Sequence, residues 1–148
     1  MADSRRAIHL LNRPRSRDVS TVVAERAYEL CARSGLELDF AMLGGEPHAA
    51  PEVEHAVLQI VSEAVANAAQ HSGARGVAVE LSQSDGGFSV RVSDDGCGFD
   101  PAAVQGVRRR LGGFGLTSMA ERAQALGGHF RIRSGPAGGG TTVEVTFR

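Results

Sequence analysis

The sequence predicts an α+β fold, a two-layer sandwich in which helices cover one face of a mixed, mostly antiparallel sheet. Two observations predict it. Some stretches place apolar residues at helical spacing, and other, shorter stretches alternate apolar and polar residues as half-buried strands do. Along the chain these stretches follow the order helix, strand, helix, hairpin, glycine-rich loop, helix, hairpin. Helices interspersed with hairpins favour a sheet that is covered on one side.

The N-terminal half predicts a helix, a strand and a longer helix. Asp18 or Ser20 is placed to cap a helix that runs to about Ser34. Alternation over residues 36–42 predicts a half-buried strand. Residues 51–71, PEVEHAVLQIVSEAVANAAQH, then repeat apolar side chains at helical spacing. We expect this second, amphipathic helix to organise the domain.

The C-terminal half predicts two hairpins with a helix between them. Residues 77–81 and 88–92 alternate, and the Asp-Gly-Gly sequence between them has turn chemistry. A helix is expected over residues 116–126, where two glycines end it. Residues 129–133 and 142–147 alternate again. These elements complete one domain, as the length of 148 residues and the 42% hydrophobic and 22% charged content favour.

Composition excludes several classes of protein. All 16 basic residues are arginine, so the lysine that P-loop ATPases, eukaryotic-type protein kinases and Schiff-base enzymes require is missing. A net charge of -1 and the lack of a long apolar run predict no nucleic-acid partner and no membrane contact by this segment. Two cysteines in unlike contexts fit a reducing compartment, so we expect a cytoplasmic location.

Polar residues gather along the organising helix. Glu63, Asn67 and His71 are four residues apart, so they project in nearly the same direction beside the apolar face. Taken alone, this helix is equally consistent with solvated polar residues that merely flank the apolar stripe. An acidic, glycine-paired turn ends the strand that finishes near Asp94, and Gly113 precedes the third helix, where backbone N–H groups attract anions.

Four ordered segments carry a resemblance to a known family. VSEAVANAAQHSGA, SDDGCGFD, GGFGLTSMAERAQALGG and GGGTTVEV resemble the N box, the two glycine boxes and the closing Gly-Thr box of the GHKL ATPases, which share the Bergerat fold. The similarity is strongest to the ATP-binding domain of bacterial sensor histidine kinases of the subgroup that pairs with helix-turn-helix response regulators. It covers about residues 19–147. Four boxes in order are far more specific than any one of them.

The resemblance implies a site for ATP and Mg²⁺. Asn67 would coordinate Mg²⁺, for which an amide oxygen is a suitable hard ligand. Glu63 would be the catalytic, polarising base, and Asp94 would accept a hydrogen bond from the adenine amino group. Other residues of the boxes would contact the nucleotide: His71, Gly96, Gly98, Gly113, Gly115, Leu116 and Thr141.

The sequence departs from the family at the phosphates. Many members carry a basic residue where this chain has Gln70. Compensating charge would then come from elsewhere, and Arg75, Arg108 or Arg109 are candidates. The stretch 101–113 loses apolar periodicity between glycines, so we expect it to be an ATP lid that nucleotide protects.

The N-terminal residues predict the domain organisation. Residues 18–148 would be the catalytic domain, and residues 1–17 the remnant of a dimerisation helix or a linker. His9 is followed by Leu10 and not by the acidic residue that usually follows the phosphoacceptor histidine. The acceptor would therefore lie on a separate dimerisation domain. We expect a monomer for this chain, a homodimer for the intact kinase, and a response regulator as the next partner.

Two alternatives share the implied fold. An anti-sigma-factor-type serine kinase would bind a sigma-factor-like protein as its partner. A clamp ATPase of the topoisomerase or chaperone kind would use ATP to close a dimer, but this chain has neither the length nor the transducer domain of such enzymes. The sequence favours a histidine kinase-type phosphotransferase over both.

Overall fold

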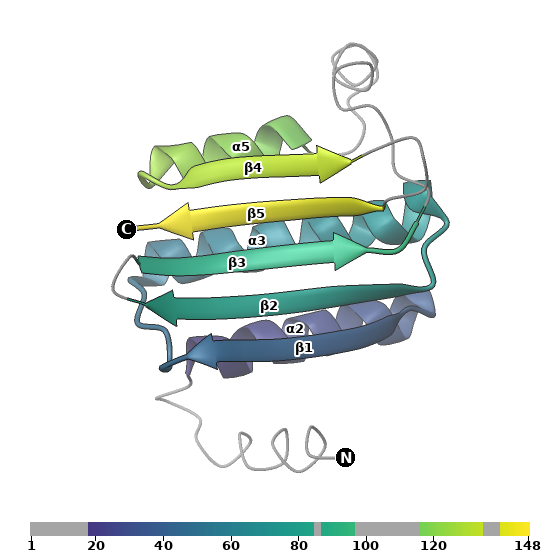
Figure 1. Ribbon diagram of the computed structural model, residues 1–148, viewed down its shortest axis with the longest axis horizontal. Coiled ribbons are helices and arrows are strands. Elements are labelled where there is room, and N and C mark those ends of the chain that lie inside the picture. The colour runs from purple at the N-terminus through teal and green to yellow at the C-terminus, as the bar shows by residue number, and fades with distance from the viewer. Residues whose placement is uncertain (1–17, 85–86, 97–115, 135–139) are drawn as a thin grey trace.

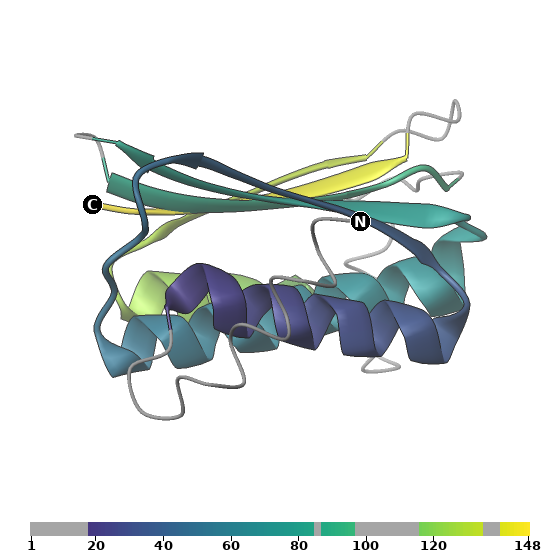
Figure 2. The same cartoon turned by 90° about the horizontal axis from the view of Figure 1, so that it is seen from below.

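The protein is a two-layer sandwich in which a five-stranded sheet packs on a layer of helices (Figures 1 and 2). The computed structural model describes residues 18–84, 87–96, 116–134 and 140–148. For residues 71–72 and 116–117 it describes the backbone but not the side chains. Figure 2 shows the helices on one face of the sheet, with the opposite face bare of other described elements. The predicted α+β fold is confirmed.

The predicted helices and strands are all present, and their ends differ from the prediction by a few residues. In chain order they are α2 (Val19–Ser34), β1 (Glu37–Gly44), α3 (Pro51–Asn67), the π-helical turn η1 (Ala68–Ser72), β2 (Gly76–Ser84), β3 (Gly87–Asp94), α5 (Leu116–Ala125), β4 (His129–Ser134) and β5 (Thr141–Phe147). Glycines end two of the helices as predicted. Gly35 and Gly127 both adopt a left-handed conformation, with φ of 73° and 78°.

The strand order is β1-β2-β3-β5-β4. Strand β1 runs parallel to β2, and the crossover between them contains α3, as a parallel pair requires. All other neighbours are antiparallel. The second hairpin joins the sheet through its later strand, so β5 lies between β3 and β4. This order places the end of β3 beside the beginning of β5.

The core lies between the sheet and the three helices. Strands β2, β3 and β5 alternate buried and partly exposed residues, so one face of each strand packs on the helices. Fully buried side chains of this core include Val23, Val57, Ile60, Val61, Val65, Val79, Leu81, Val90, Met119 and Val145. Helix α3 contacts α2, α5 and β3, which explains why its apolar face is so broad.

The N-terminus of α2 is capped from a distant loop. Asp18 occupies the N-cap position, but its side chain makes no capping hydrogen bond. The Glu46 carboxylate instead accepts hydrogen bonds from the Ser20 N–H, at 3.1 Å, and from the Ser20 hydroxyl, at 2.7 Å. The negative charge of Glu46 also lies at the positive end of the helix dipole. The prediction of a local cap is corrected to a long-range one.

The organising helix changes its hydrogen-bond spacing near its end. It is α-helical from Pro51 to Asn67 and continues as the π-helical turn η1, which Gly73 ends in a left-handed conformation. A π turn joins residues five apart instead of four. Glu63 and Asn67 both lie in the α-helical part and therefore share one side as predicted, whereas His71 lies in the π-helical turn that follows.

Several predicted features lie outside the described residues. They are the N-terminal segment 1–17 with His9, the expected lid over 101–113, and the turn residues 85–86. Within the described part of the chain, no helix is long and apolar enough to cross a membrane.

Candidate functional site

One end of the sheet brings together the ends of four elements. Figure 1 shows the C-terminal ends of α3, β3 and β4 and the N-terminal end of β5 at the same end of the molecule. Asp94, the last residue of β3, is the register partner of Thr141, the first residue of β5. Thr141 is in turn the partner of Ser134, the last residue of β4. These residues form a short polar row across neighbouring strands.

The polar row belongs to the helix-facing side of the sheet. Side chains two residues apart share a face, so Asp94 lies on the face of the buried Val92 and Thr141 on that of the buried Val143. Thr141 is 9% exposed. Its hydroxyl pairs with the Ser134 hydroxyl at 2.8 Å, so the row is held by a side-chain hydrogen bond where the apolar core ends.

One oxygen of the Asp94 carboxylate accepts a hydrogen bond from the backbone. Its Oδ1 accepts a hydrogen bond from the backbone N–H of Gly96 at 2.8 Å, which fixes the turn that follows β3. Gly96 is buried, whereas Asp94 is partly exposed. The other oxygen, Oδ2, makes no hydrogen bond to a residue in the described ranges, so it is an acceptor open to a donor from outside.

Gly140 allows β5 to approach Asp94 closely. It has a φ of 73°, and a Cβ atom built on it would lie 2.1 Å from the Asp94 carbonyl oxygen. A side chain at this position would therefore strain the backbone and separate the two strands. The glycine keeps Thr141 in register with Asp94.

A second carboxylate anchors the neighbouring strand. Asp95 Oδ1 accepts hydrogen bonds from the backbone N–H groups of Arg75, at 2.8 Å, and Gly76, at 3.1 Å. The hydrogen bonds from Gly76 and Arg75 lower the pKa of the Asp95 carboxyl below its ordinary value. Asp95 thus ties the beginning of β2 to the end of β3.

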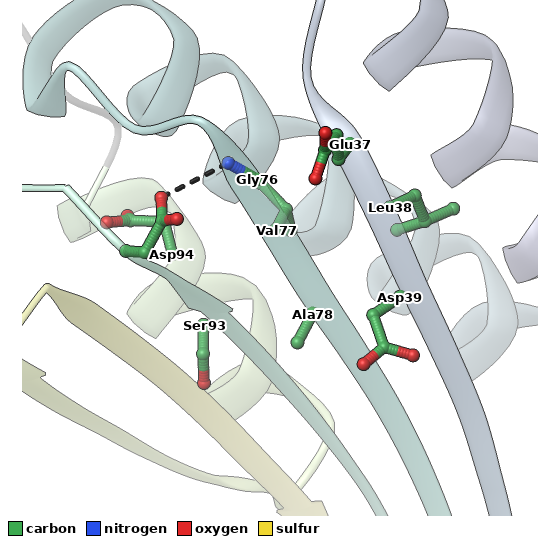
Figure 3. A pocket seen from close by; sticks show the side chains of 9 residues that line it. Glu37, Leu38, Asp39, Gly76, Val77, Ala78, Ser93 and Asp94 are labelled. Carbon is green, nitrogen blue, oxygen red and sulfur yellow. Dashed lines mark hydrogen bonds between the residues drawn. The ribbon is translucent and has the colours of Figure 1, made fainter.

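A hollow of about 340 Å³ borders this end of β1, β2 and β3 (Figure 3). The dashed line in Figure 3 is the bond that the Gly76 N–H donates to Asp95. Carboxylates dominate the polar lining of the hollow: Glu37, Asp39, Asp94 and Asp95. Like charges would repel phosphate groups here.

Helix α3 supplies the polar residues expected beside the phosphates. Glu63 and Asn67 lie four residues apart near the C-terminal end of its α-helical part, and both are partly exposed. Their neighbours Ala64, Val65 and Ala68 are buried in the core. Packing therefore holds this part of the helix in place while the carboxylate and the amide remain accessible.

The structure describes the other predicted site residues only in part. His71 lies in η1 and Leu116 begins α5, but their side chains are not described. Gly98, Gly113 and Gly115 fall outside the described residues, as do Arg108 and Arg109. Within the described residues no group of His, Cys, Asp and Glu side chains could hold a metal ion by itself.

Two residues that form hydrogen bonds at this end of the sheet were not predicted from the sequence. Ser134 bonds to Thr141, and Asp95 anchors β2. The alternation of β4 places Ser134 on the face of Ile132, so that signal could have identified the serine. Asp95 follows Asp94 directly, and the sequence carries no sign of which of the two carboxylates bonds to the beginning of β2.

Comparison with known proteins identifies the family. Residues 52–148 match the family described as histidine kinase-, DNA gyrase B-, and HSP90-like ATPase. The chain belongs to this family. The histidine kinase-like ATPase domain therefore includes α3, the whole of the polar row and both strands of each hairpin, which confirms the predicted GHKL resemblance.

Similar sequences are named sensor histidine kinases. An uncharacterized sensor-like histidine kinase of Chloroflexus aurantiacus is 38% identical over 75% of this chain and 18% of its own length. The signal transduction histidine-protein kinase/phosphatase DegS of Brevibacillus brevis is 30% identical over 99% of this chain and 37% of its own length. The ATPase domain described here thus spans well under half the length of these relatives.

A solved structure shows the same fold. The blue-light activated histidine kinase of Erythrobacter litoralis EL346 superposes with a TM-score of 0.67 and 20% identity, over 87% of this chain and 41% of that chain. The histidine kinase-like ATPase domain therefore shares its architecture with a kinase whose sequence has diverged widely.

Proposed function

We propose that this chain is the ATP-binding catalytic domain of a sensor histidine kinase. It would transfer the γ-phosphoryl group of Mg-ATP to a histidine on a separate dimerisation domain. The observation that carries the proposal is the open Oδ2 acceptor of Asp94 beside Thr141, at the end of the sheet that α3 also reaches. The names of the relatives support the reaction class.

Asp94 and Thr141 would hold the adenine ring. The free Asp94 oxygen accepts a hydrogen bond from the exocyclic amino group, and the Thr141 hydroxyl lies on the next strand within the same row. Gly96 and Gly98 would let the backbone approach the base. A carboxylate that is already fixed by the Gly96 N–H needs no rearrangement to bind, which favours affinity.

Asn67 and Glu63 would act on the phosphate side. No described cluster of ligands could hold a metal alone, so Mg²⁺ would be held by the Asn67 oxygen, phosphate oxygens and waters, as this ion prefers. Glu63 would accept a proton from the incoming nucleophile. His71, Gly113, Gly115 and Leu116 would contact the nucleotide, and catalysis would consist mainly of positioning and charge neutralisation.

The wider context of the proposal is a two-component system. A response regulator would receive the phosphoryl group from the dimerisation domain, in a cytoplasmic kinase that works as a homodimer. Residues 18–148 would form the catalytic domain, and residues 1–17 would link it to the dimerisation helix. The similar proteins reported above are named histidine kinases, so the serine-kinase alternative is not favoured.

A pair of variants on α3 tests the proposal. Glu63→Gln keeps the side-chain shape but removes the basic oxygen, so phosphotransfer should fall roughly 10²- to 10⁴-fold while ATP affinity changes little. Asn67→Ala removes the proposed metal ligand and should weaken Mg-dependent ATP binding itself. Calorimetry measures the affinity, and labelled ATP with a supplied dimerisation domain measures the transfer.

The matched control is Glu54→Gln, at the opposite end of the same helix, which should change neither quantity. Full transfer activity in Glu63→Gln would show that the base lies elsewhere. Failure of the wild-type chain to bind Mg-ATP would refute the proposed function as a whole.

A further inference from the structure

The open face of the sheet carries a basic hollow. It has a volume of about 270 Å³ and lies over β3, β5 and β4 on the face that no described helix covers. Its lining is Arg91, Ser93, Arg131, Arg133, Thr142 and Glu144. These residues alternate with the buried residues of β3 and β5 and with the partly buried residues of β4, so they lie on the face opposite Thr141 and the proposed nucleotide site.

Short side chains on two strands form the floor of the hollow. Ser93 and Thr142 are register partners, and their hydroxyl oxygens lie 3.1 Å apart. One hydroxyl donates to the other, which leaves one hydroxyl hydrogen free to donate. Arg91 on β3 and the two arginines of β4 stand around this floor. The floor and the walls therefore both offer hydrogen-bond donors.

Two of the three arginines have no partner within the described residues. Arg91 pairs with Glu80 at 3.2 Å and with Glu144 at 3.3 Å, so the carboxylate in the lining is already engaged. Arg131 and Arg133 are exposed and make no hydrogen bond or ion pair with any residue in the described ranges. They occupy alternate positions of β4, about 7 Å apart along the strand.

We propose that this hollow is a docking surface for an acidic segment of another protein. Carboxylates of that segment bind the guanidinium groups of Arg131 and Arg133, which suit bidentate pairing. The hollow is smaller than the roughly 300–1,000 Å³ of typical small-molecule pockets, and it opens onto a bare sheet face. Side chains of a macromolecule fit it better than an enclosed small ligand does.

A second copy of the chain fits this face less well. Five strands about 4.8 Å apart and about seven residues long present roughly 500 Å², below the roughly 800 Å² per partner of a stable interface.

A peptide of alternating glutamate and serine, about twelve residues long, is the probe. Amide and guanidinium signals of the isotope-labelled chain should shift saturably on β3, β5 and β4. The double variant Arg131→Glu/Arg133→Glu should weaken binding roughly tenfold or more, because two attractive contacts become repulsive. The control Arg33→Glu/Arg148→Glu changes net charge equally at exposed sites elsewhere and should weaken it less than about twofold.

Several results would overturn the proposal. Equal weakening in both double variants would mean nonspecific attraction, and so would equal binding of a glutamine-serine peptide. Inorganic phosphate or a single-stranded oligonucleotide that binds the hollow more tightly than the peptide would assign it to another ligand. A concentration-dependent dimer that the β4 double variant abolishes would assign the face to self-association. Dispersed amide spectra of both variants show that the fold is retained.

Discussion

A substitution at Asp94 should weaken nucleotide binding without breaking the hydrogen bond that holds the turn after β3. Asp94→Asn keeps the oxygen that accepts the Gly96 N–H, but it turns the open acceptor into a donor, which would face the adenine amino group in the proposed complex. A hydrogen bond to a charged group contributes about 1.5–3 kcal/mol, so ATP affinity should fall roughly 10- to 150-fold. Calorimetry checks this, with Asp39→Asn on the open face as the control. An unchanged affinity would place adenine recognition elsewhere.

Gly140 is the residue that sets the approach of β5 to β3. Gly140→Ala should destabilise the fold and weaken ATP binding, because its Cβ would meet the Asp94 carbonyl oxygen. Gly35→Ala is a matched control, since Gly35 has the same φ of 73° but no neighbouring atom within 4 Å. The control Gly35→Ala should lower the free energy of unfolding by about 1–2 kcal/mol, because alanine disfavours the left-handed backbone conformation. Urea unfolding that gives equal losses for both variants would contradict the role of the close contact.

At the scale of elements, the long-range cap of α2 should contribute measurably to stability. Glu46→Ala removes two hydrogen bonds to Ser20 and a charge at the helix N-terminus. We expect a loss of about 1–2 kcal/mol in the free energy of unfolding, with ATP affinity unchanged. Urea denaturation measures it. Glu29→Ala, which breaks only an exposed pair with Arg33, should cost less than about 0.5 kcal/mol; an equal loss would deny the capping role.

The elements themselves were predictable where local pattern decides them. Strict alternation located every strand, and a broad apolar face located α3. The π-helical turn was not predictable, because the Ala68–Ser72 sequence carries no glycine or proline that would signal a change. Local sequence also predicted a cap at Asp18 or Ser20, whereas Glu46 in a distant loop accepts the hydrogen bonds of Ser20. Contacts between distant segments decided both outcomes.

At the scale of the whole molecule, the sequence predicted the layers but not the order of the strands. Hairpins signal which strands are neighbours in sequence, yet nothing local indicates that β5 joins β3 while β4 stays at the edge. The family resemblance predicted Asp94 and Thr141 as residues of one site, and the sheet register shows that the two are direct partners on neighbouring strands. The role of Ser134 follows from the same register.

The pairing of β3 with β5 also determines when the site forms during folding. Each hairpin joins strands that are close in sequence, so its loop closes at a small entropic cost. Strands β3 and β5 are separated by α5 and β4 and must meet across a long stretch of chain, which makes their pairing slow. Asp94 and Thr141 stay apart until that step is complete. A chain that has formed only the two hairpins would therefore lack the proposed adenine site, so ATP would stabilise only the finished domain.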